Sequence, residues 1–79
     1  MTADQLRDTL RSNVKNRRQE LGMTQAGAAG KAGLTQAFWA QIEAGQRSPR
    51  LDILADIATA LNTTPDAILS PEVFSASRG

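Results

Sequence analysis

Cysteine and histidine are both absent from this chain of 79 residues, and their absence excludes several kinds of site. Without cysteine there is no disulfide and no thiolate to bind a metal, and without histidine a common metal ligand and proton-transfer group is missing. The sequence also shows no nucleophile–base pair, no phosphate-cradling glycine loop and no spacing typical of metal ligands. We therefore expect no enzyme, no cofactor and no metal site.

Long apolar runs are absent as well. Charged residues interrupt every apolar pattern within a few positions, so nothing approaches the roughly 20 apolar residues of a membrane span. Residues 1–4 lack the basic start and apolar run of a signal peptide. We expect a soluble cytoplasmic protein with no membrane partner, formed as one domain near the smallest size that a single core supports.

The charge of the chain is small overall but unevenly placed. The formal net charge is +1, yet residues 11–50 carry seven basic and two acidic side chains, a net charge of +5, whereas residues 51–79 carry −3. A basic middle segment beside an acidic end is typical of a protein that turns one face toward nucleic acid. Chance scatter of solvated charges explains the same pattern, so charge alone leaves both interpretations open.

Capping residues, glycines and apolar spacing together predict five helices and no strand. A threonine or serine precedes each helix, and a glycine or asparagine ends most of them. The expected helices span residues 3–21, 25–32, 36–44, 49–61 and 65–69. The caps are Thr2, Thr24, Thr35, Ser48 and Thr64, and the stops are Gly22, Gly33, Gly45 and Asn62. In the fourth helix the apolar stripe is Leu51, Leu54, Ile57, Ala58 and Leu61.

The second and third helices lie too close in sequence to run antiparallel. Each has about eight residues, or roughly two turns, and only Gly33-Leu34-Thr35 separates them. The glycine permits a tight turn, Leu34 fills the corner, and Thr35 caps the next helix. Such helices cross steeply, as in a helix-turn-helix, whose second helix enters the DNA major groove. An ordinary helical hairpin within a small bundle is the alternative at this point.

Four short stretches around this turn carry a family pattern. They are Thr24-Gln25, Gly33-Leu34-Thr35-Gln36, Ile42-Glu43-Ala44-Gly45 and Ser48-Pro49. Over residues 10–69 the chain thus resembles the Xre/Cro family of lambda-repressor-like DNA-binding domains. The resemblance implies an all-α fold of five helices, with residues 36–44 as the recognition helix. It also implies a prokaryotic or phage-encoded regulator of transcription, most simply a repressor, with residues 1–9 extending the first helix and residues 70–79 forming a tail.

The resemblance assigns a face that reads double-stranded DNA. It places Gln36, Ala37, Ala40 and Gln41 at the base-contacting positions, and the helical phase independently turns these four side chains outward. Glutamine has a donor and an acceptor that suit the N6/N7 edge of adenine, and an alanine methyl suits the thymine methyl. Solvated glutamines are common on exposed helices, and this is the alternative interpretation of both.

A second group is expected to contact phosphates. The resemblance places Gln25, the first residue of the second helix, at a phosphate-contacting position, where its backbone N–H also favours an anion. It places Gln46, Arg47 and Ser48 in a loop that flanks the DNA backbone. Three basic residues are weaker candidates because exposed charges often only solvate the surface: Arg17, Lys31 and Arg50.

Three further residues have structural roles. The resemblance implies an ion pair between Arg18 and Glu43 that fixes the docking of the first and third helices, while its net stabilisation can be small. Glu43 has no partner carboxylate or histidine, so it is not interpreted as a catalytic base. Gly33 is expected to form the turn.

The core departs from the family pattern at two positions. Ala28 stands where the family usually has leucine, and Trp39 stands where it usually has isoleucine or valine. Because interiors are close-packed, we expect Trp39, on the inward face, to fill the volume that Ala28 leaves. Gly27 and Gly30 flank Ala28 and each costs about 1 kcal/mol relative to alanine within a helix.

A homodimer is expected because one such domain contacts too few base pairs to be specific. Two recognition helices about 34 Å apart would read a pseudo-palindromic operator. Ile68, Leu69, Val73 and Phe74 form the expected interface, with Leu6 in the first helix as the competing site; alternatively, Val73 and Phe74 fold back on their own domain. A protein-interaction module that keeps the fold, antitoxin- or coactivator-like, is the alternative function.

Overall fold

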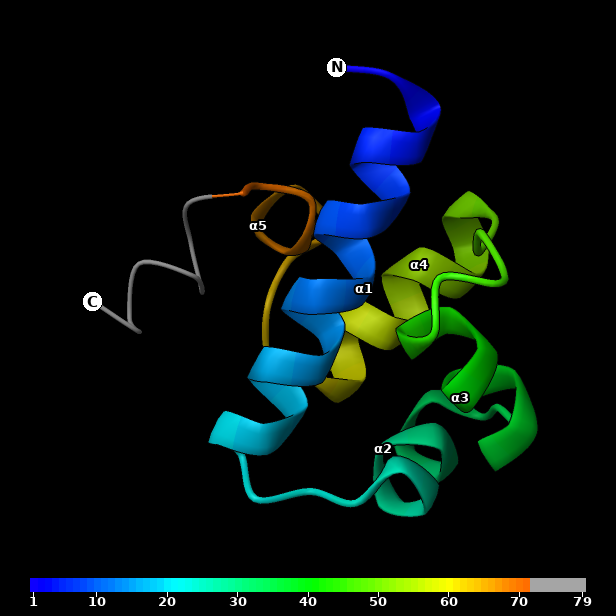
Figure 1. The fold of residues 1–79 in the computed structure, drawn as a ribbon. Coiled ribbons are helices and arrows are strands. Elements are labelled where there is room, and N and C mark those ends of the chain that lie inside the picture. Colours follow the sequence, from blue (N-terminus) through cyan, green and yellow to red (C-terminus); the bar gives the residue numbers. More distant parts are fainter. Residues whose placement is uncertain (72–79) are drawn as a thin grey trace.

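Five helices enclose one small core. The computed structural model describes residues 1–71, with α1 (Ala3–Glu20), α2 (Gln25–Ala32), α3 (Gln36–Glu43), α4 (Leu51–Ala60) and α5 (Pro65–Ile68). Figure 1 shows α1 running the length of the molecule, with α5 on one side of it and α2, α3 and α4 on the other. α1 packs on α3 and α5, and α2 packs on α3 and α4. This all-α, five-helix architecture is the one that the sequence predicted.

No helix within residues 1–71 combines the length and the apolar character needed to cross a lipid bilayer.

Threonine caps begin four of the five helices, as predicted. In each case the threonine hydroxyl accepts a hydrogen bond from the backbone N–H three residues later. Thr2 and Gln5 form a reciprocal capping box with distances of 2.8 and 3.1 Å. The predicted stops Gly22, Gly33, Gly45 and Asn62 adopt positive φ angles of 70°, 73°, 76° and 54°. Local sequence therefore determined where these helices begin and end.

The start of α4 differs from the prediction. Ser48 and Pro49 lie before the helix, and Arg50 is the N-cap, with no capping hydrogen bond from its side chain. Ser48 instead accepts a hydrogen bond from Arg7 Nε at 2.7 Å, so its hydroxyl is engaged by α1. Leu51 is 83% exposed and does not belong to the apolar stripe.

Trp39 is the largest side chain of the core. It is fully buried, as is Ala28, and both belong to one cluster with Val14, Ile42 and Ile57. The many alanines of this cluster leave room for the indole ring, which agrees with the expectation that Trp39 compensates for small neighbours.

Two side chains of α1 fasten the later helices. Asn13 is buried and donates its amide to the carbonyls of Ile68 and Ser70, both at 2.8 Å. Arg17 donates Nε–H to the carbonyl of Leu61 at 2.9 Å. Carbonyls at helix ends lack intrahelical partners, and these bonds satisfy them. Arg17, a weak candidate for DNA contact, therefore serves the junction of α4 and α5.

Gly30 is a site where the helix can be improved. It lies exposed in the last turn of α2, and a Cβ atom built there meets no other atom within 4 Å. We expect Gly30→Ala to raise the free energy of unfolding by about 0.5–1 kcal/mol, measured by urea denaturation, because alanine loses less backbone entropy in a helix. Gly33→Ala is the control: its φ of 73° disfavours alanine, so stability should fall. Equal shifts in both variants would contradict this explanation.

Candidate nucleic-acid interface

The turn between α2 and α3 sets the direction of α3. Gly33 ends α2 in the left-handed conformation, and the N–H of Leu34 donates to the carbonyl of Ala29 at 2.8 Å. Leu34 packs against the core, and the Thr35 hydroxyl accepts from Phe38 N–H at 3.1 Å. These contacts are those of a tight turn between steeply crossing helices.

α3 has one buried and one open face. Trp39, Ile42 and Glu43 are buried. On the other side, Gln36 and Ala37 are exposed, and Ala40 and Gln41 are half-buried. Residues three and four positions apart are neighbours on a helix, so these four side chains form one continuous patch. The structure thus brings the four predicted base-contacting residues together.

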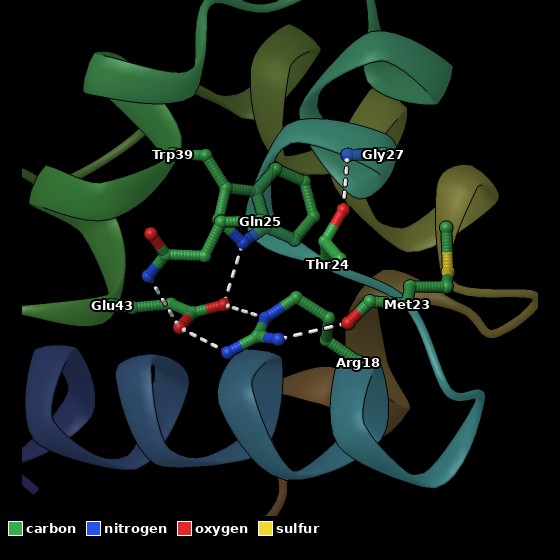
Figure 2. A network of polar contacts seen from close by, with 7 residues as sticks. All are labelled: Arg18, Met23, Thr24, Gln25, Gly27, Trp39 and Glu43. Carbon is green, nitrogen blue, oxygen red and sulfur yellow. Dashed lines mark hydrogen bonds and ion pairs between the residues drawn. The ribbon is translucent and has the colours of Figure 1, made fainter.

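Glu43 lies at the centre of a polar network that joins three helices (Figure 2). Arg18 of α1 donates to its two carboxylate oxygens at 2.6 and 3.0 Å. Gln25 of α2 donates to Oε1 at 3.1 Å, and the indole N–H of Trp39 donates to Oε2 at 2.6 Å. Arg18 also donates to the carbonyl of Met23 at 2.8 Å. The network fixes α3 against α1 and α2, and therefore fixes the orientation of its open face.

Burial and hydrogen bonding oppose each other at Glu43. Its side chain is 4% exposed and that of Arg18 is 12% exposed. Burial alone raises the pKa of the Glu43 carboxyl, but hydrogen bonds from Arg18, Gln25 and Trp39 outweigh it and hold the pKa below its usual value. The same pairing raises the pKa of Arg18. Both groups are therefore charged at neutral pH.

Sequence reasoning missed two members of this network. Trp39 and Glu43 lie four residues apart on one helix, a spacing at which side chains meet, so the indole donor could have been foreseen. Gln25 was expected to reach a phosphate, but its side-chain amide points to Glu43. No sequence signal distinguishes these two roles of a glutamine at a helix start.

The loop between α3 and α4 carries the remaining predicted residues. Gln46, Arg47 and Ser48 are all exposed there. Arg47 donates Nε–H to the side-chain oxygen of Gln41 at 2.7 Å, and its guanidinium lies 5.0 Å from the centre of the Phe38 ring. The loop is thus tied to the open face of α3.

A separate apolar hollow of about 270 Å³ lies between α1 and the start of α4. Five leucines line it: Leu6, Leu10, Leu51, Leu54 and Leu69. Leu6 is 38% exposed and Leu51 is 83% exposed. The two interface sites expected as competitors, around Leu6 and around Leu69, therefore border one surface.

Ile68 is the one residue of the expected dimer interface that the structure excludes. Its side chain is fully buried in the core, so it has no surface to offer a second chain. Residue 68 was assigned to an exposed cluster because α5 is too short to reveal which of its faces is inward. Val73 and Phe74 lie outside the described residues.

A sequence family described as "Helix-turn-helix domain" matches residues 5–69. The chain belongs to this helix-turn-helix family. The match spans all five helices except the first two residues of α1. Membership of a helix-turn-helix family agrees with the expectation of a binding protein rather than an enzyme.

Known proteins similar to this helix-turn-helix domain include an uncharacterized HTH-type transcriptional regulator of Sinorhizobium fredii. It is 29% identical over 66 residues, covering 84% of this chain and 86% of the relative. The match spans most of both chains, so the two are similar over nearly their whole lengths.

Solved structures share the fold. The DNA-binding domain of the P22 c2 repressor superposes with a TM-score of 0.77 at 23% identity, covering 81% of this chain and 84% of that one. The clp gene regulator ClgR of Corynebacterium glutamicum gives 0.80 at 20% identity, covering 92% and 78%. An HTH_3 family transcriptional regulator from Vibrio cholerae gives 0.80 at 26% identity, covering 95% of this chain and 43% of that one. The fold is the lambda-repressor-like fold expected from the sequence.

Proposed function

We propose that this protein is a sequence-specific double-stranded DNA-binding regulator of transcription that acts as a homodimer on a pseudo-palindromic operator. The observation that carries the proposal is the open face of α3, a continuous patch held rigid from behind by the Glu43 network. A rigid helix that projects side chains at defined positions is the element that enters a major groove. The kinship with proteins named as transcriptional regulators and with the P22 c2 DNA-binding domain supports it.

Base reading is assigned to the open face of α3. Within residues 1–71 the side chain of Gln36 makes no hydrogen bond, so its amide is available to pair with the N6/N7 edge of adenine. Ala37 and Ala40 add small apolar surfaces that fit beside thymine methyl groups. Gln41 completes the patch.

Backbone contacts are assigned to the two flanks of α3. On one flank the first turn of α2 offers the backbone N–H of Gln25, because its side chain is engaged by Glu43. On the other flank Gln46, Arg47 and Ser48 lie exposed in the loop. Such contacts hold the protein in register without specifying sequence.

Selection of bound sites from random duplex DNA tests this function. We expect a two-fold-related motif to be enriched, and Gln36→Ala to weaken binding to it by about 1–3 kcal/mol while relaxing preference at one position per half-site. Binding to random DNA should hardly change. Failure to enrich any sequence would favour the protein-interaction module, and equal losses on both DNAs would reassign Gln36 to the backbone.

We infer that the second copy in the dimer covers the leucine-lined hollow between α1 and α4. Within residues 1–71, Leu51 is the most exposed large apolar side chain, at 83% against 75% for the terminal Met1. It stands next to Leu6 and Leu69, so the apolar surface is continuous. An isologous contact here would use the same leucines from both copies.

Leu51→Ser should weaken the dimer without harming the fold. Because Leu51 is 83% exposed, the substitution removes little from the monomer. Loss of an apolar side chain from a contact raises the dimer dissociation constant about ten-fold or more, which sedimentation equilibrium would measure. Leu21→Ser, at an exposed leucine at the other end of α1, is the matched control. If Leu51→Ser leaves dimerisation unchanged, the hollow is not the interface.

A further inference from the structure

Gln41 and Arg47 form one polar unit at the edge of the open face. Arg47 Nε donates to Gln41 Oε1 at 2.7 Å, although six positions separate the two residues. A guanidinium has only donors, so the amide oxygen must be the atom that faces it. This contact determines which way the Gln41 amide points: its oxygen is turned to Arg47, and its NH₂ group is left to face away.

Two further contacts hold this unit in place. The Arg47 guanidinium lies over the Phe38 ring at 5.0 Å from its centre, within the range of a cation–π contact, and Phe38 is itself packed against the core. The backbone N–H of Gln46 donates to the carbonyl of Gln41 at 2.9 Å, so the loop returns to the same residue of α3. Arg47 is thus preorganised beside Gln41 before any ligand arrives.

The unit presents donors where a lone glutamine would present a donor and an acceptor. A glutamine that reads adenine uses its oxygen to accept from adenine N6, but in Gln41 one lone pair of that oxygen already accepts from Arg47, whose guanidinium lies beside it. The free N–H groups, on the Gln41 NH₂ and on the terminal nitrogens of Arg47, outnumber the one lone pair left on the Gln41 oxygen, so the unit offers mainly donors. In the major groove, guanine offers two neighbouring acceptors, N7 and O6, whereas adenine offers one acceptor and one donor.

We propose that Gln41 and Arg47 together form a guanine-binding unit, with Phe38 as the positioning residue that holds the guanidinium. The proposal rests on the proposed DNA-binding function and refines it: each half-site contains a guanine opposite Gln41 and Arg47, and an adenine opposite Gln36. Arg47 reads a base in addition to flanking the DNA backbone. Gln36 serves as an internal reference, since its amide has no partner within residues 1–71.

The experiment compares sites selected from random duplex DNA by the wild-type protein and by Arg47→Met. Methionine keeps an apolar stem over Phe38 and removes the guanidinium, which frees the oxygen of Gln41. We expect the wild type to prefer guanine over adenine at one position about ten-fold or more. In Arg47→Met that position should lose its preference or change to adenine, and the adenine opposite Gln36 should be kept.

Two further variants distinguish base reading by Arg47 from non-specific attraction between a positive charge and DNA. Phe38→Leu keeps the bulk but removes the ring, and should reduce the guanine preference without abolishing binding. Arg50→Met removes another exposed arginine, which lines a different hollow from the leucine-lined one, together with Arg47 and Phe38; it should weaken binding to all sequences with the preference unchanged.

Three results would overturn the guanine-binding unit. One is adenine opposite Gln41 in the wild-type sites. Another is an unchanged base preference in Arg47→Met with equal losses on selected and random DNA, which would make Arg47 a phosphate contact only. The third is an unchanged guanine preference in Arg47→Met without any loss of binding to random DNA, which would assign the reading to Gln41 alone. If no sequence is enriched by the wild type, the DNA-binding function itself fails, a result distinct from all three.

Discussion

Replacing Trp39 with alanine is expected to lower the free energy of unfolding by about 3–5 kcal/mol, the range for truncating large aromatic side chains in a core. Trp39 is fully buried in a core cluster that contains four alanines, and such small side chains cannot extend to refill the space. Total stabilities of small domains lie at about 5–15 kcal/mol, so this loss is a large share of the total. Trp39 is the one tryptophan of the chain, so the substitution also removes the tryptophan fluorescence signal. Urea denaturation followed by far-ultraviolet circular dichroism is therefore the suitable measurement.

A second substitution shows how much of this loss of unfolding free energy comes from packing and how much from hydrogen bonding. Trp39→Phe keeps most of the apolar volume but removes the indole N–H that donates to Glu43 at 2.6 Å. We expect a smaller loss of about 1–3 kcal/mol, because one hydrogen bond to a buried carboxylate is removed. A loss below about 1 kcal/mol in Trp39→Ala would show that the ring is not part of the core.

Glu43→Gln is expected to lower the free energy of unfolding by an amount similar to that of Trp39→Ala. It removes the negative charge that two nitrogens of Arg18 contact. The Arg18 side chain, which is only 12% exposed, then has no counter-charge. Breaking one side of a buried ion pair costs about 3–5 kcal/mol. Replacing both partners in the double variant Arg18→Met, Glu43→Leu should recover part of this loss, since no buried charge then remains. If the single and double variants lose the same stability, the ion pair is not the reason for the loss.

The same network predicts how stability depends on pH. Folding lowers the pKa of Glu43, so the unfolded chain binds its proton more readily than the folded one. The stability that the ionised carboxylate confers is therefore present above the unfolded-state pKa of about 4.3, and is lost as the pH falls through the lower folded-state pKa. Denaturation midpoints measured from neutral pH into this acid range should fall, and in Glu43→Gln the fall should be smaller.

The network also connects stability with the proposed interface. Trp39 and Glu43 lie on the buried face of α3, directly behind the patch of Gln36, Ala37, Ala40 and Gln41. A substitution that loosens the buried face changes the tilt of the helix, and with it the position of every side chain that would meet a base. Variants of Trp39 that stay folded should therefore lose specific binding more than binding to random DNA.

The amino-acid sequence by itself determined the helices and the turn. Threonine caps and left-handed glycines act through contacts within a few residues, so they could be read directly, and the alternation of buried and open positions on α3 followed from helical spacing. The family pattern at residues 24–49 led from these elements to the fold and to the four outward positions. Four helix ends were predicted one residue too late, and the largest error, two residues at the start of α4, occurred where Ser48 is engaged by Arg7, 41 residues earlier.

Only the tertiary structure decided which partner each polar side chain has. Gln25, Gln41 and Gln46 look alike in the sequence, yet the first is bound to Glu43 and the second to Arg47. The burial of Ile68 and the exposure of Leu51 likewise depend on which helix packs over them. The physical reason is range: caps and turns depend on neighbours in the chain, whereas a side-chain partner or a covering surface is supplied by a distant segment whose position exists only once the helices have packed.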